Sequence, residues 1–134
     1  MAAAALLLAL TASASAADVA AGEKRFQVCV ACHKVGPDAY NTIGPMLNDI
    51  VGKPAASVEG FYYSTPLKEA RGAGLVWTPD KLEAFLVNPR QMIPHSSMAF
   101  AGLKPADAAN VVAYLETLSP DFHAVSAPPP PPTQ

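Results

Sequence analysis

Two cysteines and a histidine stand close together in this chain and could attach a cofactor. Both cysteines of the sequence lie in the pentapeptide Cys29-Val30-Ala31-Cys32-His33. This C-x-x-C-H spacing is the sequence signal for covalent haem attachment. The two thiols can add to the two vinyl groups of one haem, and the adjacent imidazole of His33 can then point at the iron. The pattern therefore predicts one covalently bound haem c, with His33 as a ligand to its iron.

Other uses of the cysteine pair are open from these residues alone. The pair could form a structural disulfide or a thioredoxin-like redox pair, although a redox pair normally opens a helix within a βαβ pattern and no strand-rich stretch is present. A zinc site would need more ligands, for which the chain offers His95 and His123. Neither histidine forms a metal-ligand spacing with the cysteines, so the pentapeptide favours haem.

A six-coordinate haem that transfers electrons needs a second axial ligand from elsewhere in the chain. A methionine thioether raises the reduction potential relative to a second imidazole, because it favours the ferrous state. The candidate ligands in this sequence are Met46, Met92, Met98 and His95.

The segment from Asn88 to Lys104 resembles the methionine loop of class I c-type cytochromes, the mitochondrial type and its bacterial, cytochrome c2-like relatives. In that family a helix ends at Asn-Pro, an Ile-Pro follows, and the ligand methionine precedes a Phe and a Gly at fixed spacing. Met98 meets each of these spacings. The resemblance implies that His33 and Met98 hold the iron. Met46 and Met92 are then packing residues, and His95 is an exposed loop residue or an alternative ligand that binds when the loop rearranges.

The resemblance also assigns residues around the haem. It makes Gly44-Pro45 a turn in which the Pro45 carbonyl accepts the ring N–H of His33, a contact that orients the imidazole and raises its basicity. Tyr63 and Trp77 match positions that donate hydrogen bonds to a buried propionate. A buried carboxylate is costly unless it is paired, and these side chains combine an apolar body with one donor. Lys53 could add charge compensation.

The chain departs from the family pattern at a few positions. Phe85 stands where the family usually has a Tyr near the ligand sulfur, and His95 replaces a typical Gly. The stretch from Ser64 to Val76 is longer than in the mitochondrial proteins. These differences bear on the reduction potential and on the strength of the methionine ligand.

Helix signals place the elements that would carry this site. Asp18 can cap a first helix that runs to about Ala31. Thr78-Pro79-Asp80 starts a second helix, which Asn88-Pro89 ends. A last helix runs from near Pro105 to Leu118. The expected fold class is all-α, a small cytochrome c fold of three main helices with short helices and loops around one haem. The resemblance makes the first and last helices cross at Gly22, Phe26, Val111 and Tyr114.

The ends of the chain differ from the domain between them. Residues 1–16 are uncharged, with an apolar core too short to span a bilayer and a small-residue site at Ala14-Ser15-Ala16, and they are interpreted as a signal peptide for export to the periplasm. The alternative is an Ala-rich helix packed on the fold. Residues 17–120 form the expected cytochrome domain. Residues 121–134 are a Pro-rich tail that includes five consecutive prolines, which favour an extended polyproline helix.

The composition excludes some functions. With 9 Lys and Arg against 11 Asp and Glu, the mildly acidic chain is an improbable nucleic-acid binder. The resemblance implies a soluble, monomeric one-electron carrier, not an enzyme. It would work between a quinol-oxidising cytochrome complex and a terminal oxidase or photosynthetic reaction centre, with a periplasmic dehydrogenase as another donor. Alternatives are a haem peroxidase or ligand sensor with a labile Met98, and a cytochrome module tethered to a dehydrogenase. Few cations flank the expected haem edge: Lys34, Lys53, Arg90 and Lys104.

Overall fold

The computed structural model describes residues 16–122, and the helices within this range are joined by long loops. The helices are α1 (Val19–Phe26), α2 (Thr65–Gly72), α3 (Pro79–Val87), α4 (Pro89–Met92) and α5 (Pro105–Thr117). Within the described range, β-type pairing is limited to an isolated antiparallel bridge between Pro54 and Val76. The all-α fold class expected from the sequence is confirmed. The proposed signal peptide, except for Ala16, and most of the proposed tail lie outside the described residues.

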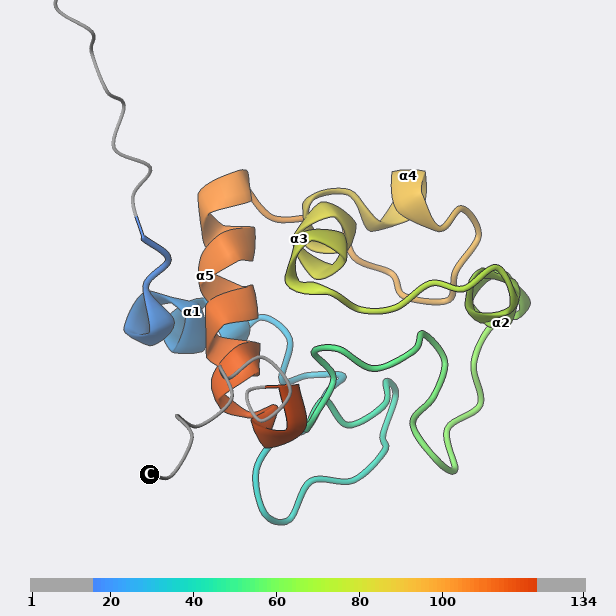
Figure 1. The fold of residues 1–134 in the computed structure, drawn as a ribbon, viewed down its shortest axis with the longest axis horizontal. Helices are drawn as coiled ribbons and strands as arrows, with labels where there is room; N and C mark the ends of the chain where they lie inside the picture. Colours follow the sequence, from blue (N-terminus) through green and yellow to red (C-terminus); the bar gives the residue numbers. More distant parts are fainter. Residues whose placement is uncertain (1–15, 123–134) are drawn as a thin grey trace, which may run out of the picture.

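The first and last helices cross beside each other, on the left of Figure 1. Gly22 is buried at the crossing, where a Cβ atom would overlap the backbone carbonyl of Asn110. One turn later in α1, the ring of Phe26 lies 5.4 Å from that of Tyr114. Removing one side chain lets the two backbones approach, and the aromatic pair then fills the space next to them. The crossing therefore lies at the residues expected from the sequence.

The first helix is shorter than the predicted span to Ala31. Asp18 caps α1 by accepting a hydrogen bond from the Ala21 N–H, as expected. After Phe26 the backbone tightens, because Val28 and Cys29 donate to carbonyls three residues earlier in the chain. Such i to i−3 bonds are typical of a helix terminus. The cysteine motif thus follows the helix as separate turns and is not part of it.

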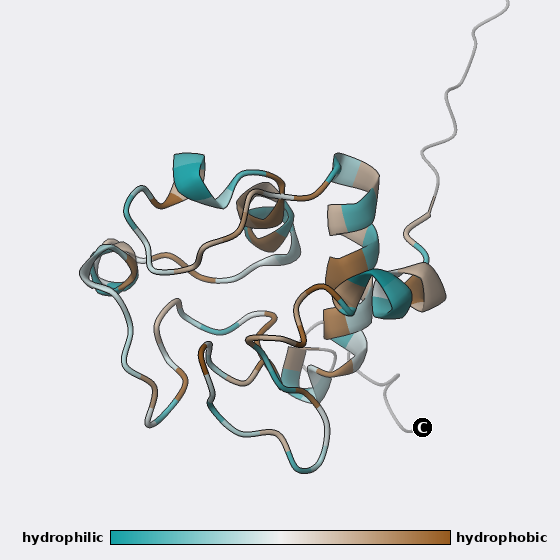
Figure 2. Ribbon diagram, turned by 180° about the vertical axis from the view of Figure 1, so that it is seen from behind, coloured by the Kyte–Doolittle hydropathy of each residue, from teal (hydrophilic) through white to brown (hydrophobic). Residues whose placement is uncertain are grey.

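The second predicted helix has the expected bounds. Thr78 caps α3 by accepting from the Lys81 N–H at 3.3 Å, and Asn88 ends the helix. Asn88 also caps the short α4, since its side chain accepts from the Gln91 N–H. The helices α2 and α4 did not emerge from the sequence analysis. Figure 2 shows why for α4, which is mostly hydrophilic where α3 and the middle of α5 carry hydrophobic residues.

The core lies between α1, α3 and α5 and continues under the loops. Its buried hydrophobic side chains include Phe26, Val51, Trp77, Leu82, Phe85, Leu86, Ile93, Leu103, Val111, Val112 and Leu115. Cys29, Met92 and Met98 are partly buried and pack against this cluster. Among the described helices, none is long and apolar enough to cross a membrane.

Candidate haem site

The cysteine motif forms a turn directly after α1. The N–H groups of Cys32 and His33 both donate to the Cys29 carbonyl, at 3.1 and 2.9 Å. Cys29 and Cys32 are free and partly exposed thiols. Burial raises the pKa of the Cys29 thiol, an effect that the nearby Arg25 charge opposes. The turn therefore presents two thiols and one imidazole from five consecutive residues.

The His33 ring is oriented by a backbone carbonyl. Its Nδ1 atom lies 2.7 Å from the Pro45 carbonyl oxygen. A carbonyl can only accept, so Nδ1 carries the proton and Nε2 keeps its lone pair. Burial lowers the pKa of His33, and the bond to Pro45 partly offsets this shift. A neutral imidazole with a fixed ring and a free Nε2 is the form that binds a metal.

The loop that contains Thr42 and Gly44 holds the cysteine motif in place. The Gly44 N–H donates to the Cys32 carbonyl at 2.8 Å, and the Thr42 hydroxyl donates to the same oxygen at 2.7 Å. A Cβ atom on Gly44 would come within 2.7 Å of His33 Nδ1. The absence of a side chain at Gly44 is what allows the imidazole to lie this close to the loop.

Met98 lies in the loop between α4 and α5, as its spacing requires. Its side chain is partly buried against the core, and its carbonyl accepts from the Phe100 N–H at 3.0 Å. His95, three residues earlier, is exposed and has a φ of 63°, in the left-handed region that favours glycine. The departure from glycine at this position therefore has a conformational cost.

Tyr63 and Arg71 both hold the loop at residues 56–58. The Tyr63 hydroxyl accepts from the Val58 N–H at 3.0 Å, and Arg71 Nη1 donates to the Ala56 carbonyl at 2.8 Å. Burial raises the pKa of Tyr63, while the Val58 bond and the Arg71 charge lower it less. The sequence analysis did not single out Arg71. It lies in α2, a helix without buried residues that gives no apolar pattern to detect.

Trp77 is buried and tied to the segment that precedes Tyr63. The backbone carbonyl of Trp77 accepts from the Gly52 N–H, and the backbone N–H of Trp77 donates to the Lys53 carbonyl, both at 2.8 Å. Its ring lies 5.0 Å from that of Phe85. The Lys53 ammonium instead reaches Asp121, with Nζ 3.0 Å from Oδ2. The structure thus pairs Lys53 with a carboxylate of this chain, whereas the sequence analysis considered Lys53 for charge compensation near the propionates.

Comparisons with known proteins place the chain in a family. A family model described as cytochrome c matches residues 19–119. The chain belongs to the cytochrome c family. Cytochrome c2 of Agrobacterium tumefaciens (strain II Chrys) is 48% identical over 99 residues, which cover 73% of this chain and 89% of the relative. The solved structure of cytochrome c2 from Rhodospirillum centenum is 36% identical, with a TM-score of 0.73, and covers 77% of this chain and 99% of that one.

Cytochrome c2 of Afifella marina is similar to the same extent, at 48% identity over 104 residues, or 77% of this chain and 84% of the relative. As a member of the cytochrome c family, the chain binds one haem c covalently and carries electrons through it. The residues present fit that group. The two thiols are unpaired, and the oriented imidazole keeps a lone pair.

In the part of this cytochrome that the structure describes, no set of side chains could serve as the ligands of a zinc ion. Within residues 16–122, no three His, Cys, Asp or Glu side chains come together as a metal ion would require. His123, one of the two histidines considered for such a site, lies outside the described residues. Cys29 and Cys32 do not form a disulfide in the structure, because both thiols are free.

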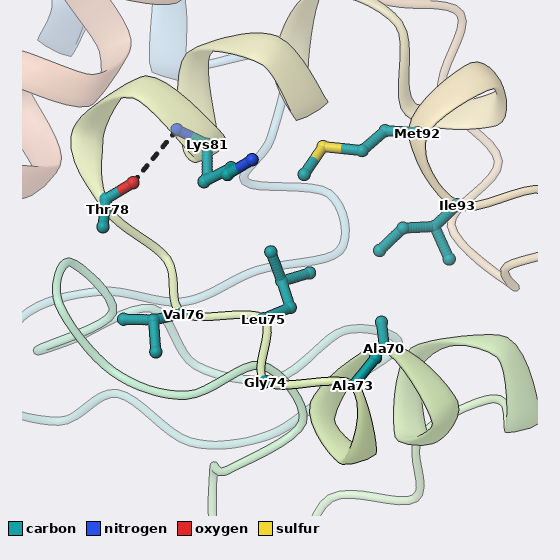
Figure 3. A pocket seen from close by; sticks show the side chains of 9 residues that line it. All are labelled: Ala70, Ala73, Gly74, Leu75, Val76, Thr78, Lys81, Met92 and Ile93. Atoms are coloured by element: carbon teal, nitrogen blue, oxygen red, sulfur yellow. Dashed lines mark hydrogen bonds between the residues drawn. The ribbon is translucent and has the colours of Figure 1, made fainter.

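Two neighbouring cavities of the cytochrome lie beside α2 and α4, away from the cysteine motif. The larger, of about 480 Å³, is lined by small and apolar side chains from α2, the segment at 74–78 and α4, with Lys81 at its rim. Figure 3 shows Leu75, Met92 and Ile93 pointing into this space. The smaller one, of about 430 Å³, continues past Glu69 to His95. Met92 therefore lines a cavity and packs on the core, in agreement with its expected packing role.

Proposed function

We propose that this cytochrome moves single electrons by outer-sphere transfer through a haem held by Cys29 and Cys32, with His33 and Met98 as the axial ligands. Bound haem supplies the iron centre that changes oxidation state. The chain supplies the thiols for covalent attachment, the imidazole on one face and the thioether on the other. A thioether ligand favours the ferrous state and sets a high potential.

The contact between His33 Nδ1 and the Pro45 carbonyl carries this proposal. It fixes the proton on Nδ1, so the ring meets iron through Nε2. Gly44 and Thr42 hold the Cys32 carbonyl from the same loop. Contacts within the chain itself therefore orient the imidazole, which lowers the cost of ordering the ligand.

Tyr63 and Trp77 are proposed to donate hydrogen bonds to a haem propionate, with Arg71 as the neighbouring cation. The Tyr63 hydroxyl uses its oxygen to accept from Val58, so its own proton remains to donate. Arg71 is close enough to lower the pKa of Tyr63. Arg71 would thus supply the positive charge that the sequence analysis considered for Lys53, because the Lys53 ammonium is paired with Asp121.

Filled axial positions leave no site at iron for a substrate, so the proposed role is a carrier and not an enzyme. The resemblance to cytochromes c2 supports a place in the periplasm, to which residues 1–16 would direct the chain as a signal peptide. Its partners would be a quinol-oxidising cytochrome complex as donor and a terminal oxidase or photosynthetic reaction centre as acceptor. A periplasmic dehydrogenase is a further donor.

Absorption spectra of the holoprotein test the ligands. The chain is co-expressed with a haem-attachment system, and spectra are taken oxidised, dithionite-reduced and as the pyridine haemochrome. A sharp α-band on reduction and a weak far-red band in the oxidised form are expected. Met98→Ala should abolish the far-red band, and the matched control Met92→Ala should keep it. A colourless folded protein, or a far-red band that survives in Met98→Ala, would overturn the proposal.

A further inference from the structure

The last described turn of the chain, residues 118–122, packs on the loop at residues 49–53. The Val51 N–H of this loop donates to the buried Ser119 hydroxyl at 3.2 Å. Phe122 is partly buried and packs against the core. Figure 1 shows the turn, at the red end of the chain, beside the loop. The first two residues of the proposed Pro-rich tail are therefore held on the folded part of the chain.

This packing brings an acidic side chain to Lys53. The Asp121 Oδ2 atom accepts a hydrogen bond from Lys53 Nζ at 3.0 Å. Asp49 adds a second negative charge nearby, and its buried Oδ1 atom accepts no hydrogen bond within the described residues. The hydrogen bond to Asp121 and the charges of Asp121 and Asp49 raise the pKa of Lys53. The ammonium is therefore held by carboxylates of its own chain.

The backbone of the same lysine is joined to Trp77. The Trp77 N–H donates to the Lys53 carbonyl at 2.8 Å. Trp77 is one of the two residues proposed to donate hydrogen bonds to a haem propionate. A lysine carries its charge on a flexible stem of four carbon atoms. Because this stem starts beside Trp77, a propionate and the Asp121 carboxylate would compete for the Lys53 ammonium.

The pair of Lys53 and Asp121 is open to solvent. The two side chains are 42% and 71% exposed. Exposed ion pairs contribute little to stability, because water and salt screen the attraction. Substitution of either residue should therefore move a charge without unfolding the protein. The effect of the pair is thus to be sought in where it places the ammonium.

We propose that Asp121 is a positioning residue, which holds the Lys53 ammonium away from the haem propionates and thereby lowers the reduction potential of this cytochrome. The inference rests on the proposed function. A positive charge close to haem favours the ferrous state, because reduction adds one negative charge to the group. Without the Asp121 carboxylate, the ammonium would turn to the propionate, and the potential would rise.

Redox titration of the holoprotein tests this role. The ratio of reduced to oxidised protein at a fixed ambient potential is read from the α-band, at about 0.01 M salt, where the screening length is roughly 30 Å. Asp121→Asn should raise this ratio about threefold to tenfold, and tenfold corresponds to about 59 mV for one electron. Asp121→Glu keeps a carboxylate and should stay within about twofold of the parent protein.

Asp121→Asn also removes a negative charge, which by itself favours the ferrous state. A double-mutant cycle separates the two effects. With the ammonium removed by Lys53→Met, Asp121→Asn should change the ratio less than about twofold. Glu116→Gln is the matched control, since Glu116 lies near the same end of α5 and is in no ion pair of the described residues. Its ratio should also change less than about twofold.

NMR of the protein with ¹³C-labelled lysine locates the ammonium without reference to the potential. The unpaired electron of oxidised haem shifts the signals of nearby nuclei, and this shift falls steeply with distance. The Lys53 Cε signal should therefore move more between the reduced and oxidised forms in Asp121→Asn than in the parent protein.

Three outcomes would overturn the proposal: equal potentials for Asp121→Asn and the parent protein, an equal effect of Asp121→Asn with and without the Lys53 ammonium, or a Lys53 Cε shift that does not change. The absorption spectrum of every variant is recorded first. A missing c-type spectrum in the parent protein would count against the proposed function itself, and is thereby distinguished from failure of the role of Asp121.

Discussion

Gly22 of α1 lies against the backbone carbonyl of Asn110 in α5, with no room for a Cβ atom between them. Gly22→Ala should therefore push the two helices apart and separate Phe26 from Tyr114. Overpacking of this kind costs about 1–3 kcal/mol. The free energy of unfolding of the holoprotein, from denaturant titration, should fall by that amount.

The control for this substitution is Gly72→Ala in α2, where an added Cβ atom meets no other atom within 4 Å. Alanine is a better helix former than glycine, so this variant should be as stable as the parent protein or up to about 1 kcal/mol more stable. A Gly22→Ala protein as stable as Gly72→Ala would show that the crossing can relax without loss.

Gly44→Ala should disturb the proposed iron ligand directly. The new Cβ atom would come within 2.7 Å of His33 Nδ1 and displace the ring from the Pro45 carbonyl. We expect a weaker far-red band, a changed reduction potential and a loss of about 2 kcal/mol or more in stability. An unchanged spectrum and potential would mean that the loop moves in place of the imidazole.

Ser119→Ala should be costly although it removes a single oxygen atom. The buried Ser119 hydroxyl donates to the Leu115 carbonyl at 2.9 Å and accepts from the Val51 N–H at 3.2 Å. Its loss leaves a buried donor without that partner, which costs about 1–3 kcal/mol. Thr117→Ala removes an exposed hydroxyl from the same helix end and should change stability by less than about 0.5 kcal/mol. Thermal unfolding of both variants measures the difference, and equal losses would contradict the prediction.

His95→Gly should stabilise the methionine loop. His95 has a φ of 63°, which glycine adopts without steric cost. We expect a gain of about 0.5–1 kcal/mol, and a far-red band that persists to higher denaturant concentration. His95→Ala keeps the unfavourable backbone but removes the imidazole. If alanine stabilises the loop as much as glycine does, the histidine ring and not the backbone is responsible.

Tyr63 should ionise above the ordinary tyrosine pKa of about 10. Burial raises its pKa more than the Val58 bond and the Arg71 charge lower it. A raised folded-state pKa favours the neutral phenol, so this contribution to stability is complete below pH 10 or so and is lost as the pH rises through the folded value. The difference in ultraviolet absorbance between the parent protein and Tyr63→Phe gives the titration curve. A midpoint below that of free tyrosine would contradict the prediction.

The sequence was sufficient for the elements that have strong local signals. Thr78-Pro79-Asp80 and Asn88-Pro89 mark the ends of α3, because a capping hydroxyl and a helix-breaking proline act within a few residues. The cysteine motif is likewise recognisable from five consecutive residues, because the thiols and the imidazole lie next to one another in the sequence. Such signals do not depend on the rest of the chain.

Other features depend on partners that are distant in sequence. No local pattern could pair Lys53 with Asp121, or bring Arg71 to the Ala56 carbonyl. The helix α2 has no buried residue, so it lacks the apolar periodicity by which helices are found. The end of α1 at Phe26 was missed for a different reason. After Phe26 the hydrogen bonds run to the residue three positions earlier and no longer to the one four positions earlier. Residues that favour helices also adopt this tighter turn, so the residue types do not mark where α1 ends.

The crossing of α1 and α5 also has a consequence for the order in which the molecule is made, because the two helices lie side by side (Figure 1) but are the first and last helices in the sequence. A ribosome releases Gly22 early and Asn110 only when the domain is almost finished. Until then α1 has nothing to pack on, and closing so long a loop is slow. The cysteine turn that follows α1 therefore remains accessible until α5 is available to pack on α1.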